Sequence, residues 1–183
     1  GFADADSDDD ASSYAWAINR MDAGEGDTLE GGYVGGDEVS CTVTPNDGTE
    51  DGLSMSSTPV IIGNTAPTTP VIAISPSAPV TETDDLVCEV LTASYDADGD
   101  PISMGFTWTQ DGVAWVGAAA TSTLPGDTIP ASETGYEQTW MCIATPSDGS
   151  LDGTSAVDSV TTSCEVLTWY RDADGDGYGD DLD

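Results

Sequence analysis

Apolar and polar residues along this chain alternate in short segments, and no helical period of 3.6 residues persists for three turns. These segments are rich in β-branched and aromatic residues and are bounded by Gly, Pro and Asp, as strands are. They lie at residues 71–74, 86–91, 102–109, 139–144 and 156–162. The pattern predicts an all-β protein with about seven strands in roughly 100 residues.

An internal repeat organises the chain. The segment DADSD at 4–8 aligns without a gap with DADGD at 96–100, and the same alignment places Trp16 on Trp108. Further along, CTVTPNDG at 41–48 matches CIATPSDG at 142–149. Because a repeat reveals the structural unit, we expect two copies of one domain in this part of the chain.

A third, partial copy begins at Cys164. There CEVLT repeats residues 88–92, and the DADGD of 172–176 follows it as it follows the earlier copy. We therefore predict an incomplete domain at 1–63, a complete domain at 64–163, and a strand followed by an Asp-rich loop at 164–183.

Within the complete domain, the order Cys88, Trp108, Cys142 fits an immunoglobulin-like sandwich, in which a tryptophan packs on a disulfide between two sheets. We expect a Cys88–Cys142 bridge that stabilises the fold by about 3 to 4 kcal/mol. A generic β-sandwich with free cysteines is the alternative. The expected fold class is therefore all-β, with tandem immunoglobulin-like β-sandwiches, the first of them incomplete.

Charge narrows the classes of partner. The chain has 35 acidic and 2 basic side chains, no histidine and a formal net charge of −33. Such a chain is repelled by nucleic acids and anionic lipids, and oxygen ligands without histidine favour a hard cation such as Ca²⁺. The even number of cysteines without a Cys-x-x-Cys pair favours disulfides and an extracellular location. No apolar run is long enough for a transmembrane helix, so we expect no membrane insertion.

The last twelve residues, DADGDGYGDDLD at 172–183, have the spacing of a calcium loop, with glycine at its sixth position. The expected ligands are five carboxylates and one backbone carbonyl: Asp172, Asp174, Asp176, Asp180, Asp183 and the carbonyl of Tyr178. Aspartate in place of glutamate at the twelfth position shortens that arm. The alternative is a solvated acidic tail.

Two further calcium sites are expected where loops meet at one end of each sandwich. In the complete domain the candidate ligands are Asp96, Asp98, Asp100, Asp148 and Asp152. In the first copy they are Asp4, Asp6, Asp8, Asp47 and Asp51. The alternative is that these aspartates bind no ion and only form Asx-turns. Halophilic adaptation is a competing explanation of the charge.

The chain resembles the tandem immunoglobulin-like and cadherin-like repeats of large bacterial surface proteins. The resemblance rests on Asn64-x-Ala66-Pro67-x-x-Pro70, the Asp-x-Asp-Gly-Asp loop, Trp108 ahead of Asp111-Gly112, and the segment 142–149. The WYR at 169–171 with its Asp-rich loop resembles thrombospondin type 3 repeats. These resemblances imply calcium chelation and a role in adhesion, spacing or the extracellular matrix.

The incomplete ends suggest an assembly. The first copy lacks a strand bearing a partner for Cys41, whereas Cys164 lies in a strand-like segment with no sandwich of its own. We expect this segment to complete the first domain of another copy by β-augmentation, giving a head-to-tail homopolymer with a Cys41–Cys164 bridge. The alternatives are a segment that folds back onto its own chain and an excerpt of a longer surface adhesin.

Other function classes are less compatible with the composition. Without histidine or lysine the chain lacks a nucleophile–base pair and a phosphate-binding lysine, so no enzyme is expected. A glycan- or peptide-binding module would need an aromatic platform, for which Trp115, Tyr136 and Trp140 are candidates. Such aromatics more commonly pack in the core.

Overall fold

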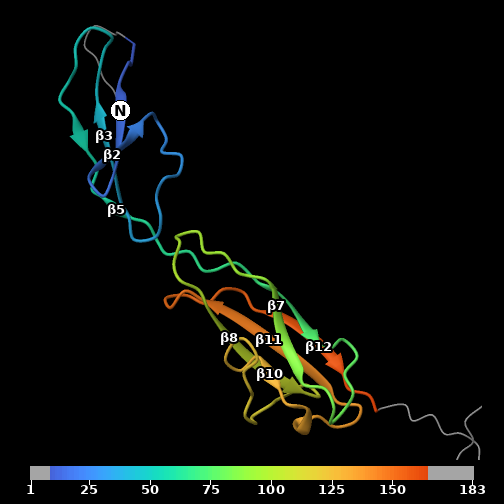
Figure 1. Cartoon of the computed structure of the whole chain (residues 1–183). Helices are drawn as coiled ribbons and strands as arrows, with labels where there is room; N and C mark the ends of the chain where they lie inside the picture. The colour runs from blue at the N-terminus through green and yellow to red at the C-terminus, as the bar shows by residue number, and fades with distance from the viewer. Residues whose placement is uncertain (1–8, 165–183) are drawn as a thin grey trace, which may run out of the picture. The chain divides into compact units, whose positions relative to one another are not determined.

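The computed structural model describes residues 9–164 and divides into two units (Figure 1). Unit 1 comprises the described residues from Asp9 to Thr68 with the segments Tyr95–Ser103 and Ser147–Gly153. Unit 2 comprises Thr69–Ser94, Met104–Pro146 and the described residues from Thr154 to Cys164. Apart from one short 3-10 helix, η1 (Ala131–Glu133), the regular elements are strands, which confirms the all-β prediction. Along residues 9–164, no helix has the length and apolarity needed to cross a membrane.

Unit 1 contains one antiparallel sheet. Its strands follow the order β2-β1-β3-β4, and β5 also pairs with β3. Their bounds are β1 (Ser13–Ile18), β2 (Met21–Glu25), β3 (Glu38–Thr44), β4 (Met55–Ser56) and β5 (Val60–Ile61). All described strands of this unit belong to this sheet, so none of them forms a second layer over it.

Two-residue turns set the register of a hairpin in each unit. Asn19 and Arg20, between β1 and β2, have φ of 51° and 66°. Asp111 and Gly112, between β8 and β9, have φ of 50° and 79°. Two successive left-handed residues make the turn that matches the right-handed twist of paired strands, and Asn, Asp and Gly adopt it at low cost.

Unit 2 is a sandwich of two sheets. The three-stranded sheet has the order β10-β7-β6, and the four-stranded sheet has the order β12-β11-β8-β9. The first sheet consists of β6 (Val71–Ser75), β7 (Leu86–Thr92) and β10 (Thr128–Ile129). The second consists of β8 (Ser103–Gln110), β9 (Val113–Ala114), β11 (Thr139–Ser147) and β12 (Ala156–Thr161). All five strand segments expected from the sequence are confirmed, with ends shifted by a few residues.

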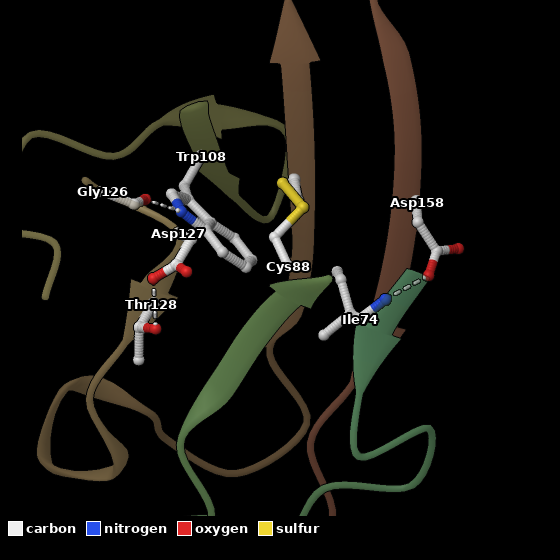
Figure 2. Close-up of a disulfide and its surroundings, with 8 residues drawn as sticks. Ile74, Cys88, Trp108, Gly126, Asp127, Thr128 and Asp158 are labelled. Carbon is white, nitrogen blue, oxygen red and sulfur yellow. Dashed lines mark hydrogen bonds between the residues drawn. A yellow bond between two sulfur atoms is a disulfide. The ribbon is translucent and has the colours of Figure 1, made fainter. Parts of the chain in front are cut away.

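The core of unit 2 lies between its sheets around the Cys88–Cys142 disulfide, which confirms the expected pairing. Cys88 belongs to β7 and Cys142 to β11, so the bond joins the two sheets covalently. The core side chains are Ile74, Leu86, Cys88, Trp108, Ile129, Trp140, Cys142 and Val160. Figure 2 shows Trp108 beside the disulfide. Two sheets, a disulfide between them and a buried tryptophan define an immunoglobulin-like sandwich.

Candidate binding face and aspartate loops

The sheet of unit 1 has one apolar face that no second sheet of the described residues covers. Strands β1 and β3 place Tyr14 opposite Val43, Trp16 opposite Cys41 and Ile18 opposite Val39. Directly opposed residues of an antiparallel pair point to the same face, so these six side chains form one apolar surface. All six are only half-buried. We call this surface the open face.

The other side of the same sheet is small and polar. It carries Ser13, Ala15 and Ala17 from β1 and Ser40, Thr42 and Thr44 from β3. The hydroxyls of Thr42 and Thr44 hydrogen-bond to Ser56 and Ser54, each at 2.8 Å. This contrast between the faces is typical of a sheet made to bury one side and expose the other.

A groove of about 630 Å³ runs over the open face. Its walls include Trp16 and Cys41 from the open face together with Leu29, Tyr33, Val60 and Ile62. Val60 and Tyr33 are 63% and 41% exposed. The groove therefore leaves large apolar side chains in contact with water.

The same residues are buried in unit 2. By the repeat, Trp16, Val39 and Cys41 correspond to Trp108, Trp140 and Cys142, which are 4%, 0% and 0% exposed. In unit 2 the sheet containing β7 covers them, with Cys88 bonded to Cys142. Within residues 9–164, the open face of unit 1 is thus the counterpart of a sandwich core, but no described strand covers it.

A tryptophan hydrogen bond supports this equivalence. The Trp16 indole N–H donates to the Gly26 carbonyl at 2.9 Å, and the Trp108 indole N–H donates to the Gly126 carbonyl at 3.0 Å. Figure 2 shows the second of these bonds. The sequence GDTL at 26–29 therefore corresponds to GDTI at 126–129. This match was missed in the sequence analysis, although aligning these two segments would have revealed it.

Asp127, in this matched segment, is a buried structural carboxylate that the sequence analysis also missed. It is 1% exposed and accepts hydrogen bonds from the backbone N–H groups of Ser122, Thr123 and Leu124 at 2.7 to 2.8 Å. The Thr128 hydroxyl donates to it at 2.7 Å, as drawn in Figure 2. Burial alone raises its pKa, but the backbone donors of Leu124, Ser122 and Thr123 outweigh this effect and lower it.

The remaining two cysteines are free. Cys41 is half-buried in the groove, and Cys164 is exposed. The residue before Cys164 is held in unit 2, because the Ser163 N–H donates to the Pro79 carbonyl and the Ser163 carbonyl accepts from the Thr81 N–H, both at 2.9 Å. The expected bond between Cys41 and Cys164 of another copy stays a prediction.

Asp98 and Asp148 lie in the aspartate loops and accept hydrogen bonds within unit 1. Asp98 accepts from the backbone N–H groups of Gly35 and Thr65, both at 2.6 Å. Asp148 accepts from the Asn64 side-chain amide at 2.8 Å and from two N–H groups of its own turn. The Thr65 and Gly35 N–H groups lower the pKa of Asp98. The Leu151 N–H and the Asn64 amide lower that of Asp148, so both carboxylates are held in the charged form.

Asp96 has one satisfied and one unsatisfied oxygen. Its carboxylate is 3% exposed, and its Oδ1 accepts from the N–H groups of Asp98 and Asp100 at 2.9 and 3.2 Å. Its Oδ2 is buried without a hydrogen-bond partner. The hydrogen bond from the Asp98 N–H to the Asp96 side chain, two residues earlier, forms an Asx-turn. Asx-turns were the expected alternative to calcium binding.

The other predicted ligands are placed as follows. Asp100 and Asp152 are exposed, and Asp152 forms an isolated bridge with Ser147. Asp51 accepts from the Asn46 amide at 2.7 Å, and Asp47 accepts from the N–H groups of Thr49 and Glu50. Across residues 9–164, no three acidic or cysteine side chains converge in a metal-binding arrangement. Three candidates, Asp4, Asp6 and Asp8, lie outside the described residues, as does the whole loop at 172–183 with Asp172, Asp174, Asp176, Tyr178, Asp180 and Asp183.

The aromatic platform considered for a glycan or peptide does not form as a surface. Trp140 is 0% exposed and packs edge-to-face against Trp115, with ring centroids 5.7 Å apart and an interplanar angle of 70°. Trp115 is half-buried and packs against the core. The expectation that these two tryptophans pack in the core is confirmed.

Comparisons with known proteins give matches among solved structures alone. No protein-family model matches the chain, and no curated protein matches it. Among solved structures, the FN1–FN3 domains of chicken CNTN1 match with 11% sequence identity and a TM-score of 0.39. The match covers 84% of this chain and 57% of that one. The class of protein, one built on an immunoglobulin-like β-sandwich, follows from the sheets and disulfide of unit 2.

Proposed function

We propose that this chain is an extracellular structural module whose unit 1 is completed by a strand from a second copy, so that copies join head to tail. The immunoglobulin-like fold and the Cys88–Cys142 disulfide support a location in an oxidising compartment. The module is proposed to act as a scaffold and not as an enzyme.

The open face carries this proposal. Its tryptophan, cysteine and indole hydrogen bond correspond to those of unit 2, where a covering strand buries them. Burying a large aliphatic or Phe side chain stabilises a protein by roughly 1.5 to 3 kcal/mol, so an uncovered apolar face of this kind favours association.

The proposed occupant is the segment that begins at Cys164. Its CEVLT sequence repeats residues 88–92, and β7, which contains those residues, is the strand that covers the equivalent face in unit 2. In β7, Cys88 and Val90 are more buried than Glu89 and Leu91. By this pattern Cys164 and Val166 would face the acceptor, whereas Glu165 and Leu167 would face away.

A contact between the open face of one copy and the C-terminal segment of the next is heterologous. It uses two different surfaces, so each added copy leaves one of each surface available. The product is an open fibre unless the rotation between copies closes a ring.

The experiment compares two single substitutions on opposite sides of the proposed strand. Val166→Asp places a carboxylate in an apolar groove, which costs several kcal/mol and should weaken association at least about 100-fold. Leu167→Asp, which adds the same charge on the outward side, is the matched control. Sedimentation velocity and negative-stain electron microscopy of the full chain would show filaments for the wild type and the control only. A wild-type chain that stays monomeric at every concentration, or equal effects of both substitutions, would refute the proposal.

Calcium binding is a second part of the proposal, supported by Asp96. The Asp96 side chain is 3% exposed, and its buried Oδ2 has no hydrogen-bond partner, so a bound cation would satisfy this oxygen. Divalent calcium is the cation that an all-oxygen site favours. Coordination by further carboxylates of unit 1 would require their side chains to turn away from the N–H groups that they now accept from.

A further inference from the structure

We propose that Cys41 is a covalent linkage site that forms a disulfide with Cys164 of a second copy. This inference rests on the proposed strand complementation and identifies the bond that fixes its register. It is carried by the position of a free thiol in an apolar groove whose counterpart in unit 2 is a completed disulfide.

The groove matches a cysteine-bearing strand. In unit 2 the Cα atoms of Cys88 and Cys142 are 6.3 Å apart, within the range that a disulfide spans. Cys142 corresponds to Cys41, and Cys88 corresponds to Cys164. Trp16 lies directly opposite Cys41, as the core tryptophan accompanies the disulfide in unit 2.

Backbone hydrogen bonding predicts the register of the incoming strand. In unit 2 the Cys88 N–H donates to the Asp127 carbonyl at 2.8 Å. The residue of unit 1 equivalent to Asp127 is Asp27, which lines the groove. The Cys164 N–H of the incoming copy would therefore donate to the Asp27 carbonyl and hold its sulfur beside Cys41.

The donor copy has Cys164 available for this contact. Both backbone groups of Ser163 are bonded to residues of its own unit 2, and Thr162 is 2% exposed. Cys164, the next residue, is exposed and free. The segment given to a neighbour therefore begins at Cys164.

The bond requires a two-electron oxidant, for which a low-molecular-weight disulfide such as oxidised glutathione suffices. The Cys41 thiolate attacks that disulfide, forms a mixed disulfide and releases one thiolate. The Cys164 thiolate of the second copy then attacks the Cys41 sulfur and releases the second thiolate. Two protein thiols are oxidised and one small disulfide is reduced to two thiols.

A mixing experiment tests the inference. Cys41→Ser retains only the donor thiol, and Cys164→Ser retains only the acceptor thiol. The two full-length variants are incubated with oxidised glutathione, separately and as an equal mixture, and analysed on non-reducing gels. Pairing of the two thiols in a bound complex raises their effective concentration, so the mixture should give at least roughly tenfold more covalent dimer than either variant alone. Peptide mapping should find Cys41 joined to Cys164, with Cys88–Cys142 intact in every variant as the control for folding.

Each outcome has a defined meaning. A ladder of wild-type oligomers that collapses on reduction, together with heterodimer in the mixture, supports the inference. Filaments of the wild type without a covalent ladder overturn the disulfide but leave the strand complementation standing. A wild-type monomer in which peptide mapping finds Cys41 joined to Cys164 indicates a bond within one chain and overturns both. A wild-type monomer that carries glutathione on both thiols also overturns both, because the two thiols then do not meet in a complex. Equal dimer in all three incubations indicates unguided oxidation and overturns the inference.

Discussion

Trp16 lies directly opposite Cys41 across the β1–β3 pair, and both side chains line the groove of unit 1. In unit 2 the corresponding tryptophan and cysteine, Trp108 and Cys142, are buried in the core. The two units thus present the same arrangement with and without a covering strand, and this difference can be tested by substitution.

The first prediction concerns Trp16. Trp16→Ala removes the largest apolar side chain of the groove, and truncating a central aromatic residue of an interface commonly costs about 2 kcal/mol or more. We expect association between copies to weaken at least about 30-fold, measured by sedimentation equilibrium. Ala15→Ser, on the polar side of the same strand, should leave association unchanged. Equal association of the two variants would contradict a role for the open face.

The second prediction concerns the disulfide of unit 2. Replacing Cys88 and Cys142 by alanine opens a loop with a sequence separation of 54. Loss of the cross-link should lower the free energy of unfolding by about 4 kcal/mol. Urea unfolding followed by tryptophan fluorescence would measure the change, under conditions where the protein is kept monomeric by Val166→Asp. The control carries Cys164→Ser instead of the two alanine substitutions. It should leave the free energy of unfolding unchanged, because Cys164 is exposed and free.

The third prediction concerns acid stability and Asp127. The pKa of this carboxyl is lower in the folded protein than its ordinary value of 3.8. Its charged form therefore stabilises the fold above that value, and the stabilisation is lost as pH falls through the folded pKa. Asp127→Asn should destabilise unit 2 at neutral pH by roughly 1 to 3 kcal/mol and should flatten the dependence of stability on pH below about pH 4.

The repeat provides a control for Asp127. Asp27 occupies the equivalent position in unit 1 but is exposed. Its side chain has a 3.5 Å contact with the Thr28 hydroxyl. Asp27→Asn should therefore leave acid unfolding of unit 2 unchanged. A loss of stability as large as that of Asp127→Asn would contradict the special role of the buried carboxylate.

The fourth prediction concerns calcium. If calcium binds the buried Oδ2 of Asp96, adding calcium after chelation should raise the melting temperature of the wild type by several degrees, since about 1 kcal/mol shifts it by roughly 2 to 8 °C. Asp96→Asn should show a smaller rise. Sodium chloride at matched ionic strength separates this effect from halophilic adaptation, which responds to total salt. Identical calcium responses of the two proteins would exclude Asp96 as a ligand.

The sequence patterns predicted much of unit 2, because β-branched and aromatic residues mark its longer strands. The two-residue strand β10 was missed, since Thr128 and Ile129 are too short a segment to alternate. Asp127 was missed because a composition dominated by aspartate conceals one that is buried and bonded to backbone N–H groups. The register that gathers Tyr14, Trp16 and Cys41 on an open face depends on strand pairing, which the residue types alone do not specify.

The bonded backbone of Ser163 has a mechanical consequence for the proposed polymer. Because Cys164 follows it directly, no slack peptide would separate the part of a copy anchored in its own fold from the part anchored in the next. A stretching force along such a polymer would act directly on the hydrogen bonds of Ser163 and on the proposed disulfide. This junction between copies should therefore resist stretching from the first increment of force.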